Sequence, residues 1–291
     1  MKTIVITGSN GFIGSNLVNS LCRENKLILL LSVKSKQKKN RYIYNKNITL
    51  KYFKNNIELN VLLKKVKGSW LIHCATHYVK NHQSNDIAKI INSNIEFGTI
   101  LLDNLNVMGV KNFINFSTVW ENYNGIKDNP NNLYSASKQA FEKIINYYQI
   151  KNLKINFYNL IISDTFGAND KRLKLISVLK KNIILKKETK IISKNLYINL
   201  LNVSDIISGI LILLSNKIKP GKYSLINKKT FKAISLIKEI QKKIKLKIKI
   251  RWLSSKVIKE KIYNYKYLPK WKPRNSNINS LIRFILDDYK N

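Results

Sequence analysis

The sequence predicts an α/β fold in which a doubly wound parallel sheet is followed by a smaller C-terminal lobe. Short apolar runs alternate with segments of helical spacing between residues 3 and 162, which is the order of a parallel sheet with crossover helices. The runs are continuously apolar, which indicates strands that are buried on both faces. A Gly-rich turn joins the first run to the first helical segment, as in sheets that bind nucleotides.

The apolar pattern gives the expected elements in order. We expect strands at 3–6, 26–33, 49–53, 70–74, 112–116 and 155–162, and helices at 12–22, 57–66, 87–108 and 133–148. Further helices are expected at 173–181, within 202–214, at 231–244 and at 278–288. This order predicts a nucleotide-binding domain over 1–163 and a substrate-binding lobe over 164–291, with a segment near 200–215 returning to the first domain. Ligands of open α/β sheets bind at the carboxyl ends of the strands, where we expect the lobe to lie.

The charge of the chain is extreme. Lys and Arg number 53 and Asp and Glu number 16, which gives a formal net charge of +37 over 291 residues. Such a charge is typical of proteins that bind nucleic acid or acidic surfaces. The Lys residues are spread along the whole chain and accompany many Asn, Ile and Tyr residues, which is also the pattern of an AT-rich genome. Codon bias is the favoured interpretation, so a nucleic-acid partner is not expected despite the charge.

Cysteine content and apolar runs indicate the compartment. Cys22 and Cys74 have no paired spacing, so neither a disulfide framework nor a metal site is expected. Reduced, buried thiols suit the cytoplasm. The first strand begins so early that a signal peptide has no room, and the longest apolar runs, 27–31 and 206–214, are too short to span a bilayer. We therefore expect a cytoplasmic protein without a membrane partner.

The Gly-rich turn predicts a dinucleotide cofactor. It reads Thr7-Gly8-Ser9-Asn10-Gly11-Phe12-Ile13-Gly14, directly after a strand and at the start of a helix. Gly8 permits a tight turn, Gly11 lets backbone N–H groups approach a pyrophosphate, and Gly14 allows close packing of helix on strand. The helix N-terminus favours negative charge. The Gly residues with Asn10, Phe12 and Ile13 are the expected binding residues of a Rossmann-like domain.

The strand ends indicate which dinucleotide is bound. The second strand ends at Ser32, and Lys34 follows without an acidic residue. An acid at this position would bind the ribose hydroxyls of NAD, whereas hydroxyls and cations suit a 2′-phosphate. We therefore expect NADP(H), with NAD(H) possible. Asn56 and Ile57, after the third strand, are expected near the adenine. Ala75 and Thr76, after the fourth strand, are expected beside the dinucleotide, and His73 just before them is expected to be structural.

A tyrosine and a lysine indicate proton transfer. Tyr134 and Lys138 lie four residues apart in a predicted helix, so their side chains share one face. An ammonium near a phenol favours the phenolate and moves its pKa toward neutrality. Such a phenol can donate or accept a proton at cellular pH. Ser117 and Thr118 end the strand just upstream, so hydroxyl groups are expected near the pair.

These motifs together resemble the extended short-chain dehydrogenase/reductases of the NAD-dependent epimerase/dehydratase type. The resemblance covers nearly the whole chain. It rests on the motifs at 7–14, 75, 94 with 99, 117–118, 134–138, 164–167, 203–205 and 268–273. The resemblance implies that Thr118, Tyr134 and Lys138 are catalytic. It also implies cofactor contacts from Asn94, Ser117, Tyr134, Lys138 and Leu160, and substrate contacts from Tyr78, Trp120, Asp164 and Arg172.

A narrower resemblance concerns the reaction. Segments 118–123, 129–142 and 167–172 are similar to reductases that make CDP-linked 3,6-dideoxyhexoses such as paratose and abequose. This implies NAD(P)H-dependent reduction of a 4-keto sugar nucleotide of the CDP-4-dehydro-3,6-dideoxyglucose type, in deoxysugar and surface-polysaccharide biosynthesis. Thr118 is followed by Val119 and Trp120, whereas dehydratases of the family have Asp-Glu, so dehydration is not expected. Many members carry an Arg for the substrate phosphate just before the segment 203–205, where this chain has Tyr197-Ile198-Asn199.

Alternatives remain open. An NAD-dependent nucleotide-sugar 4-epimerase uses the same three catalytic residues but keeps and regenerates its cofactor. A non-enzymatic dinucleotide sensor or RNA-binding protein on the same fold is the second alternative. The helices at 87–108 and 133–148 are expected to form a homodimer through a four-helix bundle, as in similar proteins.

Overall fold

Backbone contacts divide the chain into two compact units. The computed structural model describes residues 1–33, 42, 44–215 and 217–287. The first unit comprises Met1–Ile161 and Ile218–Tyr223, and the second comprises Ile162–Lys217 and Ser224–Asn291. Residues 200–215, which we expected to return to the first domain, lie in the second unit, and Ile218–Tyr223 returns instead.

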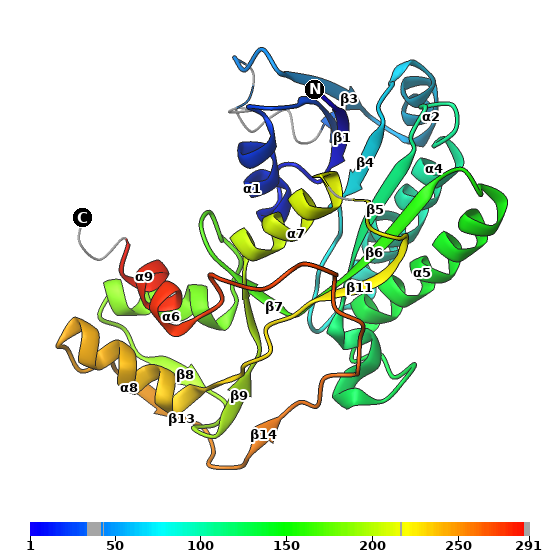
Figure 1. Ribbon diagram of the computed structural model, residues 1–291. Helices are drawn as coiled ribbons and strands as arrows, with labels where there is room; N and C mark the ends of the chain where they lie inside the picture. The colour runs from blue at the N-terminus through cyan, green and yellow to red at the C-terminus, as the bar shows by residue number, and fades with distance from the viewer. Residues whose placement is uncertain (34–41, 43, 216, 288–291) are drawn as a thin grey trace. The chain divides into compact units, whose positions relative to one another are not determined.

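The first unit is built on a seven-stranded sheet (Figure 1). Its strands are β1 (Thr3–Thr7), β2 (Lys26–Ser32), β3 (Ile48–Phe53), β4 (Trp70–His73), β5 (Asn112–Thr118), β6 (Asn156–Ile162) and β11 (Gly221–Leu225). Their order is β11-β6-β5-β4-β1-β2-β3, and β1 pairs in parallel with both β2 and β4. The strand order reverses between β1 and β4, which is where ligands of doubly wound sheets bind. The predicted fold class is confirmed.

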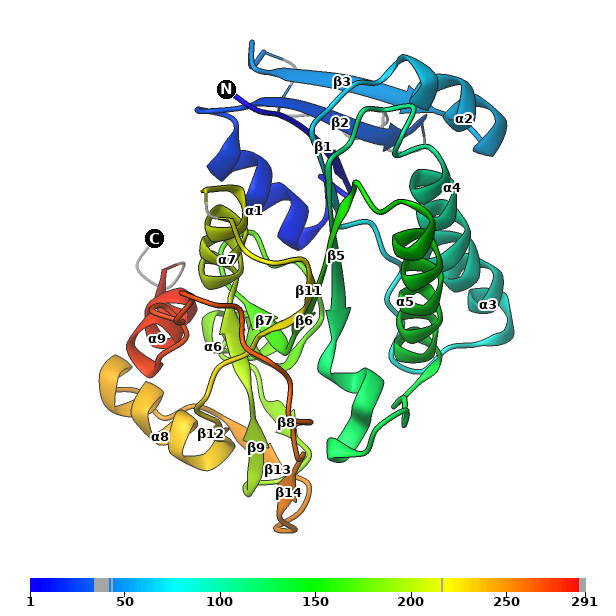
Figure 2. The same cartoon turned by 45° about the vertical axis from the view of Figure 1, so that its right-hand side comes forward.

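Helices cover both faces of this sheet. Figure 2 shows α1 (Phe12–Leu21) on one face, and α2 (Asn56–Lys65), α4 (Phe97–Asp103) and α5 (Leu133–Lys151) on the other. The long helix predicted over 87–108 is interrupted. It consists of α3 (Ser84–Ile91), the π-helical turn η2 (Asn92–Glu96) and α4, which ends five residues early. Single π-helical turns of this kind occur frequently at functional sites.

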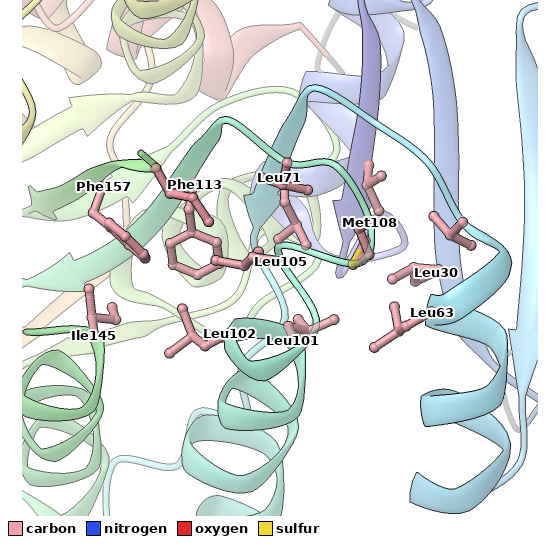
Figure 3. Packing of buried hydrophobic residues seen from close by; sticks show 14 of the residues in the cluster. Leu30, Leu63, Leu71, Leu101, Leu102, Leu105, Met108, Phe113, Ile145 and Phe157 are labelled. Carbon is pink, nitrogen blue, oxygen red and sulfur yellow. The ribbon is translucent and has the colours of Figure 1, made fainter. Parts of the chain in front are cut away.

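Apolar side chains from these helices pack onto the sheet as one core (Figure 3). Leu63 of α2, Leu101 and Leu102 of α4 and Ile145 of α5 lie against Phe113 of β5 and its neighbouring strands. Full burial of such a side chain contributes about 1.5–3 kcal/mol to stability. This core fixes α5 against β5, which are the two elements that carry the predicted catalytic residues.

The second unit combines short strands with helices α6 to α9. Its strands are β7 (Asp164–Phe166), β8 (Thr189–Ile191), β9 (Leu196–Ile198), β10 (Leu200–Asn202), β12 (Phe231–Lys232), β13 (Ile250–Trp252) and β14 (Ile258–Lys259). Its helices are α6 (Leu175–Ile184), α7 (Val203–Ser215), α8 (Ala233–Ile244) and α9 (Ile278–Leu286). Leu179 of α6, Ile240 of α8 and Ile285 of α9 form its core with neighbouring apolar residues. Strands of two or three residues show no hydropathy period, so the sequence did not predict them.

Asp205 of α7 organises the late part of the second unit. Its side-chain oxygens accept hydrogen bonds from the Arg274 and Asn275 backbone nitrogens at 2.9 and 3.0 Å, and from the Ser276 hydroxyl at 2.5 Å. The Trp271 indole nitrogen donates to the Asp205 carbonyl oxygen at 2.8 Å. Two of the motifs that carry the family resemblance, 203–205 and 268–273, are therefore joined to each other.

Two features are absent from the described residues. None of their helices has the length and apolar character that a membrane crossing requires. Among the same residues, no three His, Cys, Asp or Glu side chains are grouped so that they could hold a metal ion. Cys22 and Cys74 are both thiols outside any disulfide.

Candidate active site

The Gly-rich turn has the shape that a dinucleotide loop needs. Gly8 has φ +67°, and a Cβ there would lie 2.5 Å from the Ala75 backbone nitrogen. A Cβ on Gly14 would overlap the Gly8 carbonyl group. Gly11 is the N-cap of α1 and no side chain caps this helix end, so its first amide groups are available to an anion. The residues present therefore fit the pyrophosphate of a dinucleotide.

Two buried hydroxyl groups support the same fit. The Ser9 and Ser117 Oγ atoms are buried and have no hydrogen-bond partner among the described residues. Ser9 belongs to the Gly-rich turn after β1, and Ser117 lies near the end of β5. Buried polar groups normally have partners, so hydroxyls of this kind point to a group that the protein binds.

His73 has a structural position at the end of β4. Its Nδ1 lies 2.8 Å from the Thr7 Oγ1, and Thr7 Oγ1 also accepts from the Ala75 nitrogen at 3.3 Å. Burial, with a smaller contribution from Lys138, lowers the pKa of His73 to about 3. His73 is therefore neutral at cellular pH and joins the ends of β1 and β4, in agreement with the structural role expected for it.

Asn94 of the π-helical turn connects the loop after β4 to α5. Its Oδ1 accepts from Thr76 Oγ1 at 3.0 Å and from the His77 nitrogen at 2.7 Å. Its Nδ2 donates to the His77 carbonyl oxygen at 3.1 Å and to Ser137 Oγ at 2.9 Å. Four hydrogen bonds fix this buried amide. Asn94 and Thr76, both predicted to contact the cofactor, are thus held together beside α5.

The start of α5 fixes the position of Tyr134. Asn132 is the N-cap of α5, and its side chain accepts from the Ser135 nitrogen at 2.9 Å. The Ser135 hydroxyl oxygen in turn accepts from the Asn132 nitrogen at 3.0 Å. This capping box starts the helix one residue before Tyr134, which therefore lies in the first turn, with Lys138 one turn later. The predicted helix is present, and it carries Tyr134 and Lys138 four residues apart, as the sequence indicated.

Lys138 is buried, and its ammonium begins a chain of side-chain hydrogen bonds that reaches β5 and β6. Its side chain is only 2% exposed, and its Nζ donates to Asn115 Oδ1 of β5 at 3.3 Å. The Asn115 Nδ2 donates to Asn159 Oδ1 of β6 at 2.8 Å. Burial lowers the pKa of Lys138 to about 8, against the opposing effects of Glu121 and Cys74. This ammonium can therefore exchange its proton near neutral pH.

An aromatic side chain lies beside Tyr134, and Thr118 lies at the end of β5. Thr118 is the last residue of β5, and its Oγ1 accepts from the Trp120 nitrogen at 3.3 Å in the following 3-10 segment η3 (Val119–Gly125). The Tyr78 ring meets the Tyr134 ring edge-on at 5.0 Å and lies 6.2 Å from the Trp120 ring. Tyr78, a predicted substrate-binding residue, therefore contacts Tyr134, and Trp120, another, lies beside Tyr78.

The remaining cofactor predictions fall at varied positions in the first unit. Ser32 ends β2, and Lys34 lies outside the described residues. Asn56 begins α2 and donates to Glu96 Oε1 at 2.7 Å, while Ile57 beside it is 77% exposed. Leu160 is fully buried in β6, and its contact with a cofactor stays a prediction. In the Gly-rich turn, Asn10 is exposed, whereas Phe12 and Ile13 open α1.

Two substrate predictions belong to the second unit. Asp164 of β7 forms an ion pair with Lys174 at 2.7 Å. The Arg172 guanidinium donates to Asp170 Oδ1 at 2.7 Å and to Thr165 at 2.9 Å. Both side chains are held by partners within this unit. Their contact with a substrate stays a prediction.

The sequence analysis did not predict one cluster of oppositely charged side chains. Lys222 of β11 contacts the carboxyl groups of Glu121 in η3, at 3.3 Å, and Glu142 in α5, at 2.6 Å. The available signal was rarity, because a chain with 16 acidic residues places three of them, Glu121, Asp128 and Glu142, in the segment around Tyr134. The lysine follows Glu121 by 101 positions, so spacing gave no indication of the contact.

Comparison with known proteins agrees with this geometry. The model of the NAD dependent epimerase/dehydratase family matches residues 4–226. The chain is 25% identical over 225 residues to a CDP-abequose synthase of Yersinia pseudotuberculosis, covering 73% of each chain. Its fold is similar to a UDP-glucuronic acid 4-epimerase from Bacillus cereus in complex with NAD and a fluorinated UDP-sugar, with TM-score 0.81, 16% identity and 99% of both chains covered. It is also similar to an NAD complex of dTDP-glucose 4,6-dehydratase from Bacillus anthracis, with TM-score 0.81, 18% identity and 100% and 97% coverage.

Proposed function

The chain belongs to the NAD dependent epimerase/dehydratase family, and on that premise we propose that it reduces the 4-keto group of a nucleotide-linked sugar. The proposed substrate is a CDP-4-dehydro-3,6-dideoxyhexose, because the relative from Yersinia pseudotuberculosis is named a CDP-abequose synthase. The product would be a deoxysugar nucleotide for surface-polysaccharide biosynthesis in the cytoplasm.

One observation carries the proposal: a buried lysine lies one helical turn from a tyrosine on α5. The Lys138 side chain is 2% exposed and bonded to Asn115, and the Tyr134 ring contacts Tyr78. A phenol near an ammonium in low dielectric has its pKa lowered toward neutrality, because the charge favours the phenolate. This pair therefore suits proton donation to a carbonyl oxygen.

The chemistry divides between cofactor and protein. A reduced nicotinamide dinucleotide, whose pyrophosphate the Gly-rich turn would hold, would supply hydride for the sugar carbonyl carbon. Tyr134 donates a proton to the carbonyl oxygen as negative charge develops there. Thr118 donates a hydrogen bond to the same oxygen and fixes its orientation. Lys138 keeps the phenol acidic and binds the nicotinamide ribose.

The cofactor preference is part of the proposal. We expect NADPH to be the better reductant, because β2 ends at Ser32 without an acidic residue nearby in the sequence. An acid at this strand end would bind the ribose hydroxyls of NAD and repel a 2′-phosphate. NADH remains the alternative.

Dehydration is not proposed for this chain. Val119 and Trp120 follow Thr118, where dehydratases of the family carry the Asp-Glu pair that removes water. The next acid, Glu121, contacts Lys222. A 4-epimerase is the second candidate, because the same Thr118, Tyr134 and Lys138 serve oxidation and reduction of one sugar carbon.

The test is cofactor consumption against a panel of 4-keto sugar nucleotides that differ in base. We expect stoichiometric NADPH oxidation with a CDP-linked 4-keto-3,6-dideoxyhexose, and slower oxidation of NADH. The purified protein should carry no bound NAD absorbance. Tightly held NAD, together with interconversion of UDP-sugars and no net NADPH oxidation, would instead establish the epimerase.

A further inference from the structure

A row of buried polar side chains crosses the sheet of the first unit and contacts Lys138. His73 of β4 and Asn115 of β5 are paired in register, so their side chains lie on the same face of the sheet. Asn159 follows on β6, the next strand, and is bonded to Asn115. The exposed fractions are 1% for His73, 0% for Asn115 and 7% for Asn159. The proposed reduction assigns no role to either asparagine.

Apolar side chains surround the two asparagines. Phe113 precedes Asn115 by two residues on β5, so it shares its face, and its ring lies 5.9 Å from that of Phe157 on β6. Phe141 of α5 belongs to the same core, and Lys138 Nζ lies 5.8 Å from the centre of its ring. Amides buried in such a core cost free energy that apolar residues of the same shape would avoid. The packing of the core therefore explains neither amide.

The ammonium of Lys138 sets the direction of the hydrogen bonds in this row. An ammonium has only donors, so the Asn115 atom that faces Nζ at 3.3 Å is the amide oxygen Oδ1. The Asn115 Nδ2 is thereby directed to β6, where the Asn159 Oδ1 accepts it at 2.8 Å. The Asn159 Nδ2 is buried and has no hydrogen-bond partner among the described residues. An unpaired donor at the far end is thus the consequence of placing an acceptor at Lys138.

Other groups act on Lys138 only from a greater distance. Burial is the largest effect on Lys138 and lowers its pKa to about 8, while Glu121 of η3 and Cys74, which follows β4, raise it. His73 is neutral, because burial and Lys138 lower its pKa to about 3. Among the described residues, the hydrogen-bond acceptor of Lys138 Nζ is Asn115. The direct contact that holds the ammonium is therefore an amide oxygen.

We propose that Asn115 is a positioning residue for Lys138, and that Asn159 holds the Asn115 amide in the orientation that this requires. The inference rests on the proposed reductase function, in which Lys138 keeps the Tyr134 phenol acidic and binds the nicotinamide ribose. Asn115 Oδ1 engages one of the three N–H groups of the ammonium and favours the charged form. Two N–H groups remain for the phenol oxygen and a ribose hydroxyl. Without the Asn159 oxygen, the Asn115 amide can turn its nitrogen toward the ammonium, which repels it.

The first test measures binding of NADPH and requires no turnover. Affinity, followed by NADPH fluorescence from pH 6.5 to 10, should weaken in the wild type as pH rises through the Lys138 pKa of about 8. Lys138→Met should abolish this transition and so assign it. Asn115→Leu removes the acceptor and should move the midpoint lower by about 1 pH unit. Asn115→Asp keeps an acceptor and adds negative charge, so its midpoint should move higher by about 1 pH unit or more.

Asn159 is tested by the same measurement, with a matched control on the same two strands. Asn159→Leu leaves the Asn115 oxygen in place but frees its amide to turn, so the midpoint should move in the same direction as in Asn115→Leu. Asn156 of β6 donates to Asn112 Oδ1 of β5 at 3.0 Å, which is an exposed asparagine pair. Asn156→Leu breaks this pair and should leave the midpoint unchanged.

Turnover provides a second measurement. At pH 7 and saturating NADPH, kcat of Asn115→Leu with the CDP-linked 4-keto sugar should fall about 10-fold or more, as expected when a hydrogen bond to a charged group is lost. Asn115→Asp should recover part of this loss, because it restores an acceptor for Lys138. A merely structural asparagine would give the same loss in both variants, together with a lower urea midpoint of unfolding.

The outcomes distinguish the positioning role from the reductase function. A pH midpoint that is unchanged in both Asn115 variants, or that moves the same way in both, overturns the inference even where the wild type reduces its substrate. A transition that persists in Lys138→Met overturns it as well. Where Asn115→Leu does not fold, the upward shift expected in Asn115→Asp decides alone. Wild-type protein that reduces no sugar nucleotide, yet shows the opposed shifts, rejects the reductase function and leaves the role of Asn115 supported.

Discussion

Lys138 gives the candidate site its chemistry because the protein buries its ammonium. A buried lysine loses hydration and tends to become neutral. Here the Asn115 oxygen at 3.3 Å and the acid Glu121 counter that loss. The sequence predicted that Lys138 and Tyr134 share a helix face. It gave no indication of Asn115 or Asn159, because polar residues inside a buried strand have no local pattern.

Removal of the phenol oxygen of Tyr134 tests the proposed role of this residue. Tyr134→Phe should lower turnover by at least ~10²–10⁴-fold, since it removes the proposed proton donor. Affinity for NADPH should stay near the wild-type value, because the Gly-rich turn and Lys138 are unchanged. Turnover and fluorescence titration measure the two effects.

A matched control is available on the same helix. Tyr147 of α5 is 56% exposed, so Tyr147→Phe should leave turnover unchanged. If Tyr134→Phe turned over sugar nucleotide at the rate of Tyr147→Phe, Tyr134 would have no place in the reaction.

At the scale of elements, the π-helical turn η2 and α5 depend on each other. Asn94 of η2 donates to Ser137 of α5. Four residues later, Gly98 of α4 faces the ring of Phe141, which is fully buried. The small residue at 98 lets α4 approach α5 closely, and this approach also fixes the helix face that carries Lys138.

Gly98→Ala should therefore destabilise the protein. The added Cβ would lie 2.5 Å from the Phe141 Cε2, and an overpacked core typically costs about 1–3 kcal/mol. Urea unfolding measures the loss. The double variant Gly98→Ala/Phe141→Leu should lose less than the sum of the two single variants, because the smaller side chain makes room for the methyl group. Simple additivity of the two losses would show that the two residues are not in contact.

The whole molecule has a charge that its proposed chemistry does not require. A net charge of +37 attracts any polyanion, and it also steers a nucleotide diphosphate toward the protein. A homodimer through helices of 87–108 and 133–148 stays a prediction, as does the assignment of substrate contacts to Asp164 and Arg172.

Binding to RNA should be weak and governed by salt. Affinity that arises from phosphate contacts alone falls by about 10³–10⁵-fold between 50 and 200 mM salt for 6–10 contacts. We expect RNA binding at low salt to follow this dependence and to show no sequence preference. Electrophoretic mobility shifts in a salt series measure it. Retention of one RNA sequence at 200 mM salt would favour the RNA-binding alternative over codon bias.

The sequence determined six strands of the sheet, the Gly-rich turn and the Tyr134–Lys138 helix, but it did not predict the edge strand β11. The predicted features depend on local periodicity, on backbone geometry at Gly8 and on spacing along one helix, all of which can be read within a short window. The predicted helix over 87–108 was wrong in its middle and at its end. Asn94 of the π-helical turn forms hydrogen bonds to Thr76, His77 and Ser137, which are distant in the sequence. No local sequence pattern predicts such contacts.

Only the tertiary structure decided how ionisable groups are paired. Lys222 lies 101 and 80 positions from the two acids that it contacts, and the short strands of the second unit are defined by their partners rather than by a period. Burial decides whether a lysine is an ordinary surface cation or one whose pKa falls to about 8. The burial of a side chain depends on which other parts of the chain pack against it. The sequence therefore determines which ionisable residues are present, whereas the fold determines their ionisation.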